Sequence, residues 1–132
     1  MKYMLDTNIC IFIMKHVPNV LSAFFQKKND GVAISAITQA ELEFGLYNSN
    51  MQENNKNKLI SFLSLVEILP FDGTAATSYG MIRTELKRNG TPIGNMDMLI
   101  AAHAKSLNMT LVTNNTREFE RVKGLIIEDW TI

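Results

Sequence analysis

Residues 1–8 have the sequence MKYMLDTN, in which a short, mostly apolar run ends at Asp6 and is followed by Thr7 and Asn8. The run over 2–5 is typical of a buried strand. An Asp directly after a strand has two explanations. It can start a turn or cap the next helix, here over 9–14, or it can place a carboxylate at the sheet edge where ligands bind. The positions of the other acidic residues distinguish between them.

Short apolar runs alternate with longer helical patterns along the 132 residues. The patterns predict strands at 2–5, 31–35, 66–70, 109–113 and 125–128, and helices at 20–28, 36–48, 56–65, 74–88 and 96–107. Strands separated by helices of this length pair in parallel through crossover connections. The sequence therefore predicts one α/β domain over 1–132, in which a short parallel β-sheet is flanked by helices on both faces.

The composition is that of a folded globular protein, with 46% hydrophobic and 20% charged residues. Thirteen basic residues balance thirteen acidic ones. Because proteins that coat nucleic acid nonspecifically are usually basic, a nucleic-acid site here requires local positive charge or a partner. The single Cys10 excludes an intrachain disulfide, and no run of eighteen apolar residues predicts a membrane span. We expect a cytoplasmic protein.

Glu41 lies in the stretch SAITQAELEFGL, shortly after the second predicted strand. Two helix caps compete in this stretch. Thr38 and Glu41 match a capping box, which is a purely structural device. If Ser35 is the cap instead, Glu41 falls inside the helix on a stripe with Ile37 and Phe44, at the spacing of a core-facing side. A carboxylate on such a stripe is costly unless it is paired or bound to a cation.

Asp97 opens the predicted helix 96–107, after the loop GTPIGN. Its structural explanation is an acid that complements the helix dipole, with Asn95 as the cap. The helix is nevertheless apolar on nearly every side, which indicates a central, buried helix. Ala101 and Ala104 follow Asp97 on a face of small residues that allows a neighbour to approach closely.

The three acids occupy equivalent places beyond the strands, and ligands of parallel sheets bind there. If Asp6, Glu41 and Asp97 converge, their repulsion opposes full ionisation at neutral pH unless a cation lies between them. Oxygen ligands without a Cys or His cluster favour Mg²⁺ or Mn²⁺ over zinc. Such ions activate water and stabilise in-line attack at phosphorus.

Four stretches resemble PIN-domain ribonucleases, and more closely the VapC-type toxins of bacterial toxin–antitoxin modules. They are MLDTN, SAITQAEL, GTPIGNMDMLIAAHA and LVTNNTREF. They cover almost the whole chain in order and spacing, and the third is the most specific. The resemblance implies a Mg²⁺- or Mn²⁺-dependent endoribonuclease that acts on structured RNA, often tRNA in the anticodon region. It also implies a homodimer that forms a higher-order assembly with a cognate VapB-type antitoxin.

Carried over by position, Asp6, Glu41 and Asp97 match the catalytic, metal-binding acids of that family. PIN domains commonly have a fourth acid two residues after the Thr of the late strand. Here Thr113 is followed at that position by Asn115, which supplies no charge. An amide at this position is expected to coordinate through its carbonyl or to orient a water, and it puts a tightly held second metal in doubt.

Further charged residues lie near these motifs. Arg83, Lys87 and Arg88 precede the GTPIG loop on one predicted helix and are candidates for contact with RNA phosphates, or form a solvated face. Glu118 and Glu120 are acids that could replace the missing fourth one, although the short segment REFER is more typical of a solvated helix face.

Two other functions remain open from the residues alone. An aspartyl phosphatase would form a phosphoenzyme on Asp6, but its second acid two residues later is replaced by Asn8. A regulatory module that kept the fold and lost activity is compatible with Asn115. His103, on the predicted buried helix, is interpreted as a core histidine rather than a catalytic one.

Overall fold

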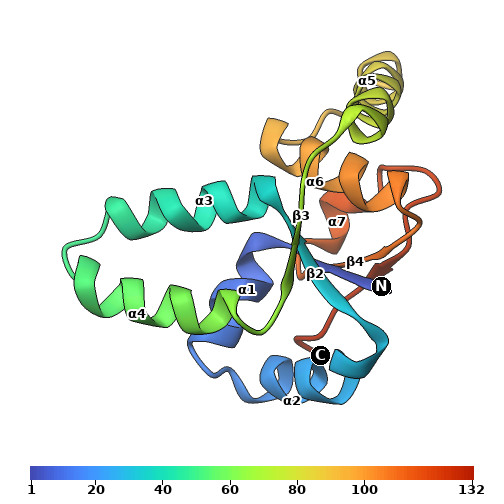
Figure 1. The fold of residues 1–132 in the computed structure, drawn as a ribbon. Helices are drawn as coiled ribbons and strands as arrows, with labels where there is room; N and C mark the ends of the chain where they lie inside the picture. The colour runs from blue at the N-terminus through green and yellow to red at the C-terminus, as the bar shows by residue number, and fades with distance from the viewer.

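The computed structural model describes residues 1–132 and contains one five-stranded sheet with the order β3-β2-β1-β4-β5 (Figure 1). All four strand pairs are parallel. The strands are β1 (Tyr3–Leu5), β2 (Val32–Ser35), β3 (Glu67–Leu69), β4 (Thr110–Val112) and β5 (Ile127–Glu128). Because every strand runs in the same direction, their carboxyl ends meet at one edge. The predicted parallel α/β architecture is confirmed.

The helices are α1 (Thr7–Met14), α2 (Pro18–Lys27), α3 (Ala36–Tyr47), α4 (Gln52–Leu63), α5 (Gly73–Arg88), α6 (Asn95–Ser106) and α7 (Thr116–Phe119), with a short 3₁₀ turn η1 (Lys28–Asp30). Figure 1 shows α3 and α4 side by side, extending away from the sheet. Helix α4 begins four residues before the predicted start at 56. Its first turns are polar and exposed, so the apolar pattern marks only the part that reaches Leu59 and Phe62 in the core.

Two apolar cores lie on the two faces of the sheet, because successive strand residues point to opposite sides. Tyr3 and Leu5 pack with side chains of α1, α2, α3 and α4, whereas Met4 packs with side chains of α5, α6 and α7. Helix α6 is the most buried helix, as its composition predicts. Its buried residues are Met98, Ile100, Ala101, Ala102, His103 and Ala104.

Helix α3 corrects one expectation from the sequence. Ser35 caps it by accepting a hydrogen bond from the Ile37 amide at 3.1 Å, so the capping box with Glu41 does not form. The buried stripe consists of Thr38, Leu42 and Leu46. The predicted core stripe of Ile37, Glu41 and Phe44 is therefore wrong by one residue, and Phe44 is 70% exposed. The displaced stripe means that α3 is rotated about its own axis relative to the prediction. Its contacts with α1 and α4 set this rotation, which the apolar residues of α3 alone do not determine.

No single helix is long and apolar enough to cross a membrane. Helix α1 and the segment Pro18–Asp30 reach the required length and hydropathy only when taken together, and the chain bends by 104° between them.

Candidate active site at the carboxyl ends of the strands

Asp6 combines both roles that its position allows. It is 5% exposed and follows β1 directly. One carboxylate oxygen, Oδ1, accepts the Thr7 amide at 2.8 Å and so caps α1. The other, Oδ2, accepts the Thr113 hydroxyl at 2.8 Å. The backbone amide of Asp6 donates to the Val112 carbonyl at 2.9 Å, which fixes the carboxylate between β1 and β4.

Glu41 is half-buried on the second turn of α3. Its Oε1 accepts the hydroxyl of Thr7 at 2.6 Å. Thr7 therefore contacts both acids, with its amide on Asp6 and its hydroxyl on Glu41. One residue at the start of α1 thus holds carboxylates that are far apart in the sequence.

Asp97 is half-buried in the first turn of α6. Gly94 occupies the N-cap position of this helix, and no side chain caps the helix end. The predicted Asn95 cap is therefore wrong. Asn95 is itself the first helical residue. A Cβ atom on Gly94 would lie 3.3 Å from Oδ2 of Asp97, closer than an ordinary contact. The glycine therefore leaves room for the carboxylate.

Glu118 is a fourth acid at this site, contrary to the interpretation of its segment as a solvated face. It is half-buried on α7, and its Oε1 accepts the Gly94 amide at 3.3 Å. Its Oε2 accepts a hydrogen bond from the side-chain amide of Asn115. Glu120 is exposed, as expected for a solvated face. A helix of four residues has no periodicity that a sequence pattern could detect, so the sequence does not separate the two.

The charges of these acids act on one another. Burial and, in decreasing order of effect, the negative charges of Asp6, Glu118 and Glu41 together raise the pKa of Asp97 to about 6. Burial also raises the pKa of Asp6, against the lowering effect of the hydrogen bonds from Thr113 and Thr7. Glu41 and Glu118 add to that rise. Asp6 and Asp97 therefore each lie within electrostatic range of Glu41 and Glu118.

The donor atoms at this site match a hard divalent cation. They are carboxylate oxygens together with the hydroxyls of Thr7 and Thr113, and a cation would relieve the repulsion between the acids. As the side chains lie, no three acidic, His or Cys groups converge tightly enough to hold one ion. The residues thus fit Mg²⁺ or Mn²⁺ by the chemistry of their oxygen atoms, and the hydrogen bonds to Thr7, Thr113 and Asn115 set their present orientations.

Burial of Asp97 and its repulsion by the other acids predict a stability gain for Asp97→Asn. The pKa of Asp97 rises from its ordinary value of 3.8 to about 6 on folding. The folded chain therefore binds more protons than the unfolded chain between these values, and stability falls as the pH rises through this window. With a chelator present, we expect Asp97→Asn to stabilise the protein by about 1 kcal/mol at pH 7 after screening of this half-exposed group, and by nearly nothing at pH 4.

Thermal unfolding at the two pH values measures this effect, which corresponds to a Tm increase of about 3 °C at pH 7. Asp30→Asn is the matched control, because Asp30 is exposed in η1. Equal Tm values for wild type and Asp97→Asn at pH 7 would contradict the raised pKa of Asp97 in the folded protein.

Two of the three basic candidates share a cleft beside α6. Arg83 and Lys87 line a hollow of about 380 Å³ together with the loop residues Pro92 and Ile93 and with Asn95 at the start of α6. The guanidinium of Arg83 donates to the hydroxyl of Tyr79 at 2.8 Å. Arg88 lines a different hollow on α5, with Gly80 and Thr84. The structure therefore groups Arg83 with Lys87 and separates Arg88 from them.

His103 is a core residue, as interpreted from the sequence. It is 1% exposed, and its Nδ1 lies 2.7 Å from Oγ of Ser35. Its ring meets Phe71 edge to face, with ring centroids 5.3 Å apart. Burial lowers the pKa of His103 and favours the neutral ring.

Comparisons with known proteins identify the family of this chain. The PIN domain family model matches residues 3–125. The tRNA(fMet)-specific endonuclease VapC of Shigella flexneri is 47% identical over 131 residues, 99% of each chain. The chain belongs to the VapC family of PIN domains.

Solved VapC-family complexes share the whole fold. The VapBC2 complex of Rickettsia felis, bound to a DNA fragment from its promoter, contains a chain with 45% identity and a TM-score of 0.95 that covers 98% of this chain and 99% of its own length. DNA-bound VapBC from Salmonella typhimurium gives 45% identity and a TM-score of 0.94 over 98% of both chains. VapC proteins are the toxins of VapBC toxin–antitoxin systems. For this VapC-family member, the family resemblance inferred from the sequence is confirmed.

Proposed function

We propose that this VapC-family chain is a Mg²⁺-dependent endoribonuclease of the cytoplasm that hydrolyses structured RNA, with tRNA cut in the anticodon region as its substrate. The observation that carries the proposal is the group of mutually repelling carboxylates at the strand ends. The name of the Shigella flexneri relative, a tRNA(fMet)-specific endonuclease, supports tRNA as the substrate class.

The side chains have different proposed roles: metal binding, substrate contact and the positioning of other residues. Asp6, Glu41 and Asp97 would hold Mg²⁺ or Mn²⁺, which activates water and neutralises charge on the phosphate when bound. Glu118 would complete the group of acids, held in place by Asn115. Because no protein nucleophile is needed, water is the attacking group. Hydrolysis then leaves a 5′-phosphate and a 3′-hydroxyl.

Arg83 and Lys87 are proposed to contact RNA phosphates beside the acids. Both are exposed, and their shared cleft includes Asn95 at the start of the helix that carries Asp97. These cations would offset the repulsion between the acidic site and the RNA backbone. Arg88 is exposed on the same helix and is assigned a weaker role, because it does not line this cleft.

Cleavage of purified tRNA, followed by sequencing of the new ends, tests the proposed reaction. With Mg²⁺ we expect cleavage with 5′-phosphate and 3′-hydroxyl ends, and with a chelator we expect none. Cyclic phosphate ends would contradict a water-driven hydrolysis. A trapped phosphoaspartate would support the phosphatase alternative, and Mg²⁺ binding without RNA turnover would support the regulatory one.

A groove between α1, α3 and α4 is proposed as the seat of a cognate VapB-type antitoxin. The groove holds about 350 Å³ and is lined by Ile11, Met14, Lys15, Glu41, Leu42, Gly45, Leu46, Asn55, Lys58 and Leu59. Because Glu41 lies in its wall, a segment bound there would reach the acids. The related solved structures are VapBC complexes, which supports this occupant.

A homodimer and a higher-order assembly with the antitoxin are part of the same proposal. The exposed Phe44 and Tyr47 beside the groove are candidates for the dimer contact.

Gly45→Phe is expected to weaken antitoxin binding at least about tenfold without loss of stability. A Cβ atom on Gly45 would have no atom within 4 Å, so the new side chain is tolerated and occupies the groove. Replacing a helical glycine also stabilises α3. The matched control is Gly80→Phe on α5, where a Cβ atom likewise meets nothing within 4 Å. Calorimetric titration with a purified cognate VapB-type antitoxin measures both, and wild-type affinity in Gly45→Phe would place the antitoxin elsewhere.

A further inference from the structure

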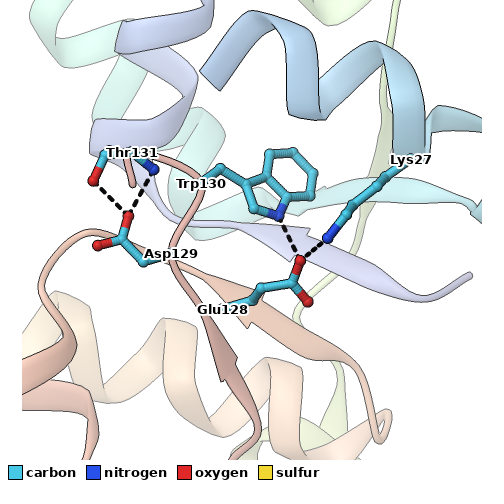
Figure 2. Close-up of polar contacts among 5 residues, drawn as sticks. All are labelled: Lys27, Glu128, Asp129, Trp130 and Thr131. Carbon is cyan, nitrogen blue, oxygen red and sulfur yellow. Dashed lines mark hydrogen bonds and ion pairs between the residues drawn. The ribbon is translucent and has the colours of Figure 1, made fainter. Parts of the chain in front are cut away.

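The last strand of the sheet is held by side chains rather than by its own length. Strand β5 contains two residues, Ile127 and Glu128, and lies at the edge of the sheet next to β4. A strand this short makes few ladder hydrogen bonds. Its side-chain anchor is Glu128, whose Oε1 accepts hydrogen bonds from the Lys27 ammonium and from the Trp130 indole, the latter at 3.0 Å (Figure 2).

Lys27 is also held by aromatic rings. Its Nζ lies 5.3 Å from the ring centroid of Tyr3 and 5.7 Å from that of Trp130. These two rings pack edge to face at 5.4 Å, and each is 3% exposed. One carboxylate and two ring faces therefore hold the cation between α2, β1 and the C-terminal segment. We call Lys27, Glu128 and Trp130 the C-terminal latch.

A short chain of hydrogen bonds leads from this latch to the active site. The backbone carbonyl of Glu128 accepts the Thr113 amide at 3.0 Å. The hydroxyl of Thr113 donates to Oδ2 of Asp6 at 2.8 Å, while it accepts the Asn115 amide at 3.0 Å. Because the Thr113 hydroxyl holds one oxygen of Asp6, a shift of Glu128 moves Thr113 and then the carboxylate.

We propose that the C-terminal latch positions Asp6 for RNA cleavage through β5 and Thr113. This inference rests on the proposed nuclease function. Lys27, Glu128 and Trp130 are positioning residues, since none of them borders the acids. The carboxylates that perturb Asp6 are Glu41 and Glu118, so the latch acts on its location rather than on its charge.

Lys27→Met tests the latch, because it keeps an unbranched apolar stem of nearly the same length and removes the cation. Amide hydrogen exchange followed by NMR in the presence of a chelator is the first measurement. We expect the Thr113 amide to exchange about tenfold faster than in wild type, while the Ile82 amide in α5 is unchanged. The second measurement is tRNA cleavage, for which we expect kcat to fall about tenfold with KM unchanged.

Three variants complete the experiment. Lys28→Met removes a charge from the next residue, which is outside the latch, and should match wild type. Lys27→Arg restores the cation and should recover both measurements. Trp130→Phe keeps an aromatic ring against Tyr3 but deletes the indole donor, and should repeat the exchange effect.

Wild-type exchange at Thr113 in Lys27→Met and Trp130→Phe overturns the latch, and so does an equal response to Lys28→Met. If wild-type protein cleaves no RNA, the proposed function fails. The exchange measurement then still decides whether the latch controls Thr113.

Discussion

RNA cleavage by the Asp6→Asn variant is expected to be slower than by wild type by at least about a hundredfold. The substitution removes the charge that would bind the metal and preserves the size of the side chain. Its amide oxygen can still accept the Thr7 amide, and the Thr113 hydroxyl can turn to accept from the new NH₂ group. The cap of α1 and the contact with β4 therefore survive, and the fold is retained.

Single-turnover cleavage of tRNA with saturating Mg²⁺ measures the loss, and circular dichroism verifies the fold. Asp30→Asn is the control, because that carboxylate is exposed in η1. In cells, Asp6→Asn should also abolish growth inhibition. A variant that cleaves at the wild-type rate would remove Asp6, and with it the metal site, from the mechanism.

The Glu118→Gln variant is expected to lose about tenfold to a hundredfold in cleavage rate. Glutamine can still accept the Asn115 amide, so the local structure persists while the negative charge beside Asp97 and Asp6 disappears. The expected loss is smaller than for Asp6, since the charge of Glu118 affects Asp97 less than the charge of Asp6 does.

Glu120→Gln is a close control for Glu118→Gln. It lies two residues away and removes the same charge from an exposed position. Metal titrations of both variants, followed by cleavage rate, should show that only Glu118→Gln needs a higher Mg²⁺ concentration than wild type. If the two variants behave alike, Glu118 belongs to a solvated helix face, as its sequence segment indicates. The site then has only three acids, because Asn115 stands at the position of the fourth.

The alternation of strands and helices could be predicted from the sequence because the apolar pattern of each element depends only on the residues of that element. Buried strands are apolar runs, and α6 is apolar on nearly every side. The parallel sheet follows from the lengths of the connections, and it brings the carboxyl ends of the strands to one edge. The presence of Asp6 and Asp97 at that edge was therefore also predictable.

Other features depend on contacts that the local sequence does not record. The rotation of α3, which leaves Phe44 exposed and buries Thr38, depends on packing against α1 and α4. The placement of Glu118 depends on the Gly94 amide and on Asn115, since α7 is too short to have a periodic face. Both features join segments separated by many residues, so only the folded chain contains the interaction that decides them.

Asp6 illustrates both what the local sequence determines and what only the tertiary structure decides. The sequence by itself determined that a carboxylate stands between β1 and α1, where it can cap the helix or face a ligand, because a strand, an Asx residue and a helix start are adjacent in the chain. Only the tertiary structure decided that Thr113 holds the other oxygen and that Glu41, Asp97 and Glu118 repel it. Hydrogen bonds and repulsion depend on distances in space, and folding alone sets those distances between residues so far apart in the chain.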